Sequence, residues 1–273
     1  LGTKELGAER WQKEAISMNQ QAPVFLRTNT LKTTTVKLSE ALKKENIETI
    51  EVQNLSNALQ LKKRENVFQN KLFKEGWFEV QDAGSQMIAE FLAPGPSDYV
   101  IDACAGAGGK SLHMAALMNN KGKILALDVE AFKLEELRKR AKRAGAFNIE
   151  TKTIETGKTI KSLEKRADKL LLDVPCSGLG VLKRNPDAKW KLSAEVIERT
   201  RLLQQTILTD YSSMLKINGT MVYSTCSILP SENKQQVSLF LEQHPNFALL
   251  AEKNLFPSDG FDGFYMALLK RNS

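Results

Sequence analysis

The chain has 273 residues, of which 42% are hydrophobic and 26% are charged. These proportions are ordinary for a globular protein and exclude a disordered, collagen-like or coiled-coil chain. No apolar run approaches the ~20 residues of a membrane-spanning helix, and no signal-peptide pattern opens the chain, so we expect no membrane association. The first residue is Leu1 rather than Met, which is consistent with a fragment of a longer chain.

Lys and Arg together exceed Asp and Glu by 39 − 32 = +7, and the isoelectric point is about 9.2. This charge either serves solubility alone or indicates a polyanionic partner such as nucleic acid. The three cysteines are Cys104, Cys176 and Cys226. Their number and spacing do not fit a secreted disulfide framework or a zinc site, so we expect a cytoplasmic protein without a metal.

The first eighty residues predict a helical segment followed by a small α/β module. Residues 1–21 favour a helix with Trp11 and Ile16 in the core, and Pro23 ends it. Hydrophobic spacing then predicts the following elements in order: a strand at 24–31, a helix at 36–45, and strands at 49–52 and 77–80.

From about residue 81 onward, strand-like and helix-like runs alternate. Strands are predicted at 99–101, 123–127, 149–154, 170–172 and 220–224, helices at 132–144, 193–216 and 237–242, and a final strand pair at 247–250 and 264–269. This alternation predicts a doubly wound, mostly parallel sheet, in which ligands bind beyond the carboxyl ends of the strands. Asp102, Asp128, Asp173 and Cys226 all fall at such ends, so we expect them to converge on one crevice.

A Gly-rich turn at 102–111 (DACAGAGGKS) has three interpretations. The GxGxxG spacing of a dehydrogenase is not met. A P-loop would share the ending Gly109-Lys110-Ser111, but its first glycine would fall on Cys104. The third interpretation is a turn that binds S-adenosylmethionine, with an acid at the end of the next strand for the ribose hydroxyls. Asp128 has that position and can accept two hydrogen bonds, although a helix-capping or turn role is the alternative.

Two cysteines each follow a predicted strand, Cys176 in the segment 173–178 (DVPCSG) and Cys226 in 224–227 (STCS). A free cysteine is more often a small buried hydrophobe than a nucleophile. Two of them at strand ends favour covalent catalysis, in which a thiolate adds to carbon 6 of cytosine so that carbon 5 can attack an electrophilic methyl group. Asp173 is placed to stabilise such an adduct near ring nitrogen 3 or the exocyclic amine.

Several segments together carry a family resemblance. They are 25–30 (FLRTNT), 80–86 (VQDAGSQ), 102–110 (DACAGAGGK), 173–178 (DVPCSG), 185–190 (NPDAKW), 225–227 (TCS) and 260–265 (GFDGFY). On these motifs the chain resembles the Sun/RsmB family of RNA 5-methylcytosine methyltransferases over nearly its whole length.

The resemblance implies a Rossmann-like α/β fold of the S-adenosylmethionine-dependent methyltransferases with a small N-terminal RRM-like domain. The expected organisation is a helical segment at 1–21, an RRM-like RNA-binding module at 22–80 and a catalytic domain at 81–273. The implied function is methylation of carbon 5 of a cytosine in RNA, with ribosomal RNA preferred over tRNA, by a monomer. A P-loop-like nucleotide-binding protein and a non-catalytic RNA-binding factor remain the alternatives.

The resemblance also implies roles for individual residues. Cys226 would be the nucleophile, Cys176 would assist product release, and Asp173 would contact the cytosine with Lys110 close by. The residues that would contact the cofactor are Cys104, Ala105, Gly106, Ala107, Gly108, Gly109, Lys110, Asp128, Glu155 and Asp173. Two positions depart from the family pattern, since Gly106-Ala107 replaces a usual Ala-Pro and Glu155 replaces a usual Asp near the adenine.

Overall fold

The computed structural model describes all 273 residues, and they form two compact units. The central unit comprises residues 23–154, and the terminal unit comprises residues 1–22 and 155–273. No helix in the chain has both the length and the apolarity that crossing a bilayer requires.

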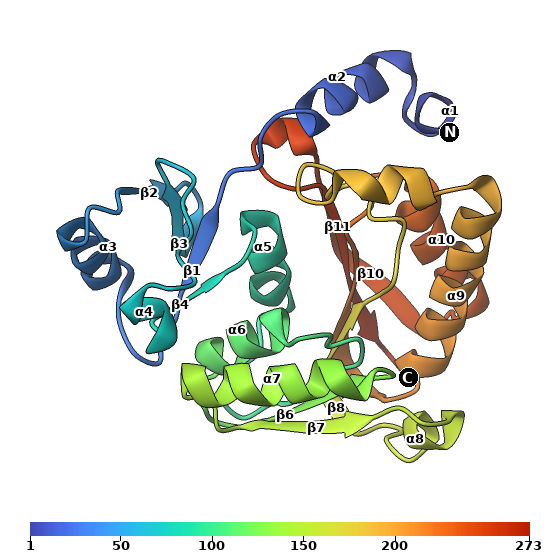
Figure 1. Ribbon diagram of the computed structural model, residues 1–273. Helices are drawn as coiled ribbons and strands as arrows, with labels where there is room; N and C mark the ends of the chain where they lie inside the picture. The colour runs from blue at the N-terminus through green and yellow to red at the C-terminus, as the bar shows by residue number, and fades with distance from the viewer. The chain divides into compact units, whose positions relative to one another are not determined.

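The central unit opens with a four-stranded antiparallel sheet (Figure 1). In order across the sheet the strands are β2 (Thr49–Val52), β3 (Leu55–Leu61), β1 (Phe25–Thr28) and β4 (Phe78–Val80). With helices α3 (Thr35–Lys44) and α4 (Lys71–Lys74) the chain order is βαββαβ, the ferredoxin-like arrangement. Leu26, Leu38, Leu42, Leu59 and Phe78 form the centre of its core.

Strand β3 was not anticipated from the sequence. Its residues 55–61 (LSNALQL) contain no β-branched or aromatic side chain, so their β-propensity is weak. The strand forms because Leu55, Leu59 and Leu61 are buried in the core of the sheet while β2 and β1 satisfy its backbone on both sides.

The central unit continues into a parallel α/β arrangement. Its elements are α5 (Ala83–Leu92), β5 (Tyr99–Asp102), α6 (Gly109–Leu117), β6 (Lys123–Asp128), α7 (Ala131–Ala144) and β7 (Ile149–Thr153). Strand β6 pairs in parallel with β5 and with β7, so the carboxyl ends of these strands lie along one edge. The three strands match the sequence prediction to within one residue, whereas α5 was not predicted.

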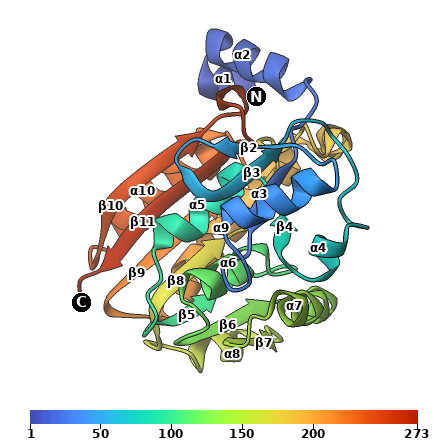
Figure 2. The ribbon, with the colours of Figure 1, turned by 90° about the vertical axis from the view of Figure 1, so that its left-hand side faces the viewer.

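The terminal unit contains four strands in the order β10, β11, β9, β8, which Figure 2 shows side by side. Their bounds are β8 (Ala167–Asp173), β9 (Leu215–Thr225), β10 (Phe247–Leu255) and β11 (Phe264–Arg271), with helices α8 (Gly157–Lys161), α9 (Ala194–Ser212) and α10 (Lys234–Gln243). Strands β8 and β9 are parallel, and Asp173 lies opposite Ser224. The loops that follow these two strands therefore leave the same edge of the sheet. Three 3-10 turns complete the unit, η1 (Pro186–Lys191), η2 (Pro230–Glu232) and η3 (Pro257–Asp259).

The N-terminal helices α1 (Gly2–Leu6) and α2 (Ala8–Met18) pack within the terminal unit. The carboxylate of Glu14 is fully buried and accepts from the amide and hydroxyl of Ser258 at 2.9 and 2.8 Å. Trp11 packs against the cluster around Met18, as predicted. The prediction for Ile16 is wrong, because its side chain is 59% exposed. Two residues beyond Glu14, Ile16 points about 200° around the helix from the buried face.

A buried charge cluster ties the ferredoxin-like sheet to helix α7 inside the central unit. Glu79 on β4 is 3% exposed and accepts from Arg140 at 2.9 Å, and it also pairs with Arg143. Removing one partner of such a buried pair leaves uncompensated charge, which is strongly destabilising.

We therefore predict that Glu79→Ala lowers the free energy of unfolding by about 3–5 kcal/mol. As a control, Glu150→Ala removes an exposed pair with Lys123 at 2.8 Å and should change it by less than about 1 kcal/mol. Urea unfolding followed by circular dichroism gives both values. Equal shifts in the two variants would contradict the assignment of Glu79 to a buried network.

Candidate active site

The Gly-rich turn between β5 and α6 has an open, left-handed backbone. Gly106 and Gly108 have φ angles of +53° and +83°, a region that favours glycine. A Cβ on Gly108 would lie 2.4 Å from the Leu137 side chain, whereas beside Gly106 there is nothing within 4 Å. Helix α6 begins at Gly109 without a side-chain cap. The turn can therefore admit a ligand close to its backbone, in front of a helix N-terminus that favours negative charge.

Asp128, at the end of β6, holds this turn in place. One carboxylate oxygen accepts from the amide of Gly106 at 2.8 Å, and the other accepts from the amide of Glu130 at 2.9 Å. The turn-acid role left open by the sequence is thus present in the structure. A carboxylate has about four acceptor sites, so these two bonds leave capacity for the hydroxyls of a ligand.

The same turn disfavours the P-loop interpretation. In a P-loop the Ser or Thr hydroxyl after the lysine coordinates Mg²⁺. Here Ser111 is fully buried, and its hydroxyl donates to a carboxylate oxygen of Asp102 at 2.6 Å. The hydroxyl is therefore directed into the protein rather than toward a nucleotide.

Two arginines brace the turn from outside, and the sequence analysis did not single out either of them. Arg140 donates to the carbonyl of Ala107 at 2.8 Å, and Arg27 donates to the carbonyl of Gly109 at 2.5 Å. Burial lowers the pKa of Arg27 to about 10, so its guanidinium remains charged at neutral pH. A charged residue inside the apolar strand β1 was the available signal for Arg27.

The two cysteines that follow β8 and β9 meet at their sulfur atoms. The Sγ atoms of Cys176 and Cys226 are 3.1 Å apart, and the Cys226 amide donates to the Cys176 sulfur at 3.2 Å. Both side chains are half-buried. Asp173 ends β8, where its carboxylate accepts from the Ser224 hydroxyl at 2.9 Å. The structure thus brings two of the predicted site residues into direct contact and places the third at the end of the same strand pair.

The pKa of the Cys176 thiol is raised well above its ordinary value. The largest cause is its hydrogen bond with Cys226, followed by burial, the charge of Cys226 and the charge of Glu232. Cys176 is therefore a protonated thiol at neutral pH.

Glu232 is a further site residue that the sequence analysis missed. Its carboxylate is fully buried in turn η2 and accepts hydrogen bonds from the residues that directly follow the two cysteines, Ser177 and Ser227. The available signal was an acid close after Cys226, in the segment 230–233 (PSEN).

The remaining predicted residues lie in the Gly-rich turn, in α6 and in the loop after β7. Cys104 lies half-buried in the turn, and Lys110 lies in the first turn of α6. Glu155 is exposed in the loop that follows β7. Arg184, which precedes the 185–190 motif, pairs with the buried Asp262 at 2.5 Å.

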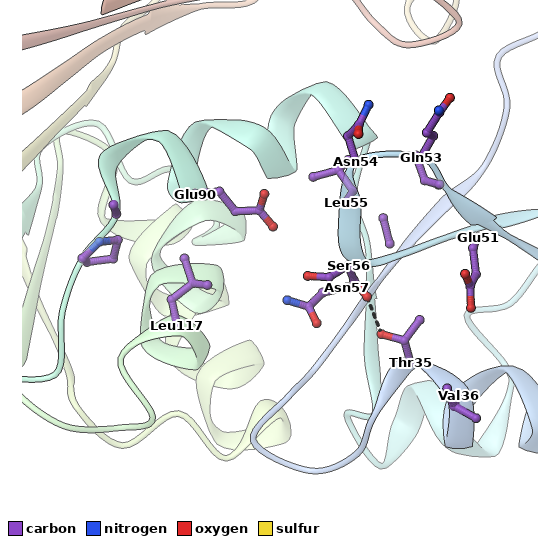
Figure 3. Close-up of a pocket in the computed structure, with 14 residues that line it drawn as sticks. Thr35, Val36, Glu51, Gln53, Asn54, Leu55, Ser56, Asn57, Glu90 and Leu117 are labelled. Atoms are coloured by element: carbon purple, nitrogen blue, oxygen red, sulfur yellow. Dashed lines mark hydrogen bonds between the residues drawn. The ribbon is translucent and has the colours of Figure 1, made fainter. Parts of the chain in front are cut away.

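A separate hollow of about 1040 Å³ lies on the ferredoxin-like module (Figure 3). It is lined by the β2–β3 hairpin, the start of α3 and residues of the following helices, and the Thr35 hydroxyl donates to the Ser56 carbonyl at its edge at 2.9 Å. Its charged lining residues are Glu51 and Glu90, with no Lys or Arg. The hollow is therefore unsuited to a phosphate and contains none of the candidate site residues.

Comparison with known proteins agrees with this geometry. The family described as "16S rRNA methyltransferase RsmB/F" matches residues 89–270, and its ferredoxin-like domain matches residues 3–68. The chain belongs to the RsmB/F methyltransferase family. The "Probable ribosomal RNA small subunit methyltransferase B" of Synechocystis sp. is 38% identical over 89% of this chain and 56% of its own length.

Solved structures confirm the fold. The methyltransferase homolog protein from Pyrococcus horikoshii superposes with a TM-score of 0.87 at 28% identity, covering 99% of this chain and 93% of its own. NSun6 from the same organism, solved with SFG, has a TM-score of 0.92 at 21% identity, covering 100% and 97% of the two chains. The fold is therefore the Rossmann-like methyltransferase fold with an N-terminal ferredoxin-like domain. This RsmB/F chain spans 56–63% of the length of the first curated relatives.

The contact between the two sulfurs predicts the reactivity of Cys176. Iodoacetamide alkylates only the thiolate form of a cysteine. Because its pKa is raised, Cys176 should react slowly at pH 8, and its alkylation rate should increase only at a higher pH than that of an ordinary thiol. Cys226→Ala removes the largest cause of the raised pKa and should accelerate alkylation of Cys176 at pH 8, because a larger fraction of its thiol is then ionised.

Peptide mass spectrometry over a pH series measures these rates. Cys104 serves as the internal control, and its rate should be unchanged in the variant. An ordinary thiol profile for Cys176 in the unmodified protein, with a midpoint near 8.5, would contradict the raised pKa.

Proposed function

We propose that this chain is an S-adenosylmethionine-dependent RNA (cytosine-5) methyltransferase acting on ribosomal RNA of the small subunit. The observation that carries the proposal is the pair of sulfurs 3.1 Å apart beyond two parallel strands, in a chain of a ribosomal RNA methyltransferase family. Relatives named as small-subunit ribosomal RNA methyltransferases support this substrate over tRNA.

The Gly-rich turn fits the methyl donor. S-adenosylmethionine supplies an electrophilic methyl group, and a fold relative is solved with SFG, an analogue of it. Residues 104–110 would hold the methionine part, since the space beside Gly106 is open and the N-terminus of α6 favours a carboxylate. Asp128 would accept from the ribose hydroxyls with its remaining lone pairs. Glu155 and Asp173 complete the proposed contacts.

The cysteine pair supports a covalent mechanism. The Cys226 thiolate adds to carbon 6 of the cytosine, which makes carbon 5 an enamine nucleophile that attacks the methyl group. Asp173, with Lys110, stabilises the adduct through ring nitrogen 3 or the exocyclic amine. The proton on carbon 5 then leaves to a base, and the bond between Sγ and carbon 6 breaks. Cys176, as a protonated thiol in contact with Cys226, donates a hydrogen bond to the departing sulfur and assists release.

The substrate must present its cytosine outside a base stack. Attack at carbon 6 requires access to the face of the ring, so the target is single-stranded or flipped out. The net charge of +7 favours binding to the phosphate backbone, and affinity should fall as salt rises.

We predict opposite phenotypes for the two cysteine variants. With tritiated cofactor and 16S rRNA, the unmodified protein should label carbon 5 of cytosine, whereas Cys226→Ser should abolish labelling because no thiolate can add to carbon 6. Cys176→Ser should accumulate a covalent protein–RNA complex that survives denaturing electrophoresis, because release is slowed. Ser162→Ala is the control, because the exposed Ser162 hydroxyl donates to the Thr159 carbonyl away from the site, and this variant should resemble the unmodified protein in both assays. Labelling that survives Cys226→Ser would overturn the assigned nucleophile.

The cofactor assignment predicts selective binding of S-adenosylhomocysteine. Titration calorimetry should detect binding of S-adenosylhomocysteine to the protein and no binding of ATP–magnesium. Asp128→Asn should weaken binding by on the order of ten- to a hundredfold, because it removes charge-assisted hydrogen bonds. Asp98→Asn, which alters a carboxylate that accepts from the Gly95 amide elsewhere in the central unit, is the matched control and should leave binding unchanged. Binding of ATP–magnesium without S-adenosylhomocysteine would establish the nucleotide-binding alternative.

A further inference from the structure

Glu232 is a buried carboxylate whose hydrogen-bond donors are all neutral. It is 0% exposed, and it accepts from the Ser177 amide at 2.7 Å, the Ser177 hydroxyl at 2.5 Å, the Gln204 amide nitrogen at 3.1 Å and the Ser227 hydroxyl. An ionised carboxylate is strongly unfavourable in a protein interior unless hydrogen bonds compensate it. Both oxygens of Glu232 are therefore committed to the groups around them.

Three of these four donors belong to the two loops that carry the cysteines. Ser177 directly follows Cys176, and Ser227 directly follows Cys226. Gln204 on α9 links Glu232 to the first loop as well, because its side-chain amide nitrogen donates both to the Glu232 carboxylate and to the Pro175 carbonyl at 2.9 Å. One carboxylate thus binds both loops at the residue that follows each cysteine, through the amide and hydroxyl of Ser177 and the hydroxyl of Ser227.

The backbone around Glu232 is itself fixed. The buried Tyr223 hydroxyl donates to the Glu232 carbonyl at 2.7 Å. The neighbouring Asn233 accepts from the Thr225 hydroxyl at 2.6 Å and donates to the Ser227 carbonyl at 2.9 Å, so it holds the residues on either side of Cys226. The carboxylate therefore acts from a rigid turn rather than from a mobile loop.

We propose that Glu232 is a positioning residue for the methyl transfer, which sets the distance and orientation between the sulfurs of Cys226 and Cys176. This inference rests on the proposed function and assigns Glu232 no contact with the substrate. The two loops are 50 residues apart in the chain, and β8 and β9 fix only where the loops begin. Beyond the strand ends the Gly180 amide donates to the Cys226 carbonyl at 2.9 Å, and the hydroxyls of Ser177 and Ser227 are 3.1 Å apart. The carboxylate binds both of these hydroxyls and so adds a buried side-chain link between the loops.

A comparison of two substitutions separates positioning from charge. Glu232→Ala removes every bond to the two loops, and a misplacement of about 1 Å can lower kcat on the order of 10²-fold. For Glu232→Ala we expect kcat to fall by this factor, while the KM values for RNA and cofactor change by less than about threefold. Glu232→Gln can keep the network, because its amide can donate to both serine hydroxyls while its carbonyl accepts from Ser177 and Gln204. It should restore most of kcat.

Ser231→Ala is the matched control. Ser231 lies in the same turn, but its hydroxyl donates to Glu5 at 2.8 Å and not to the cysteine loops. This variant should keep kcat. Calorimetric binding of S-adenosylhomocysteine and the thermal unfolding midpoint report whether each variant is folded.

A second readout does not depend on catalysis. Diamide oxidises two neighbouring thiols to a disulfide, and its azo group takes up the two hydrogens to become a hydrazine. Because the sulfurs lie 3.1 Å apart and a disulfide needs about 2.05 Å, the unmodified protein should form this bond readily. Glu232→Ala should slow the reaction by about tenfold or more, while Glu232→Gln and Ser231→Ala should not. Intact-mass spectrometry follows the loss of two hydrogens.

The outcomes distinguish the two proposals. A folded Glu232→Ala variant with unchanged kcat and an unchanged oxidation rate would overturn the positioning role and leave the proposed function standing. If Glu232→Ala does not fold, a Glu232→Gln variant that oxidises normally but loses kcat would overturn the role, since the geometry would then be intact without activity. An unmodified protein that forms the disulfide but does not methylate RNA would refute the function alone.

Discussion

The parallel pairing of β8 with β9 is the constraint on which the candidate chemistry depends. Because Asp173 lies opposite Ser224, the two chains leave the sheet at the same level and in the same direction. Two loops distant in sequence then start side by side, which is the condition for two thiols to meet. A shift of β8 by one residue in this register would turn Asp173 and the start of its loop to the opposite face.

The register alone does not place the sulfurs, and the side chains beyond the strand ends complete the arrangement. These contacts use small polar donors and one carboxylate in a buried environment, where hydrogen bonds are directional and an unmade one is unfavourable. Cys176 is affected by the same environment, since the sulfur of Cys226 and the charge of Glu232 both raise its pKa. The same two residues, Cys226 and Glu232, therefore affect both the position of the Cys176 sulfur and the protonation state of its thiol.

Sequence reasoning located the strand ends, whose positions depend on local pattern, and missed features that depend on tertiary contact. The strand ends at Asp128 and Asp173 follow from hydrophobic runs, and the family motifs identify the cysteines. Glu232 is an ordinary surface-type residue by sequence, and only the tertiary fold gives it three donors from the two loops and a fourth from Gln204 of α9. Ile16 fails for the converse reason, since an apolar residue in an amphipathic helix faces inward only if the helix phase allows it.

The Gly-rich turn depends in the same way on residues outside its own motif. Two of its carbonyls are held by guanidinium groups, Arg27 from the ferredoxin-like sheet and Arg140 from α7, while Glu79 of that sheet pairs with Arg140. Because the ferredoxin-like strands and the turn share these buried charges, neither can shift without leaving an arginine or a carboxylate uncompensated. The ferredoxin-like module is therefore a structural support of the Gly-rich turn.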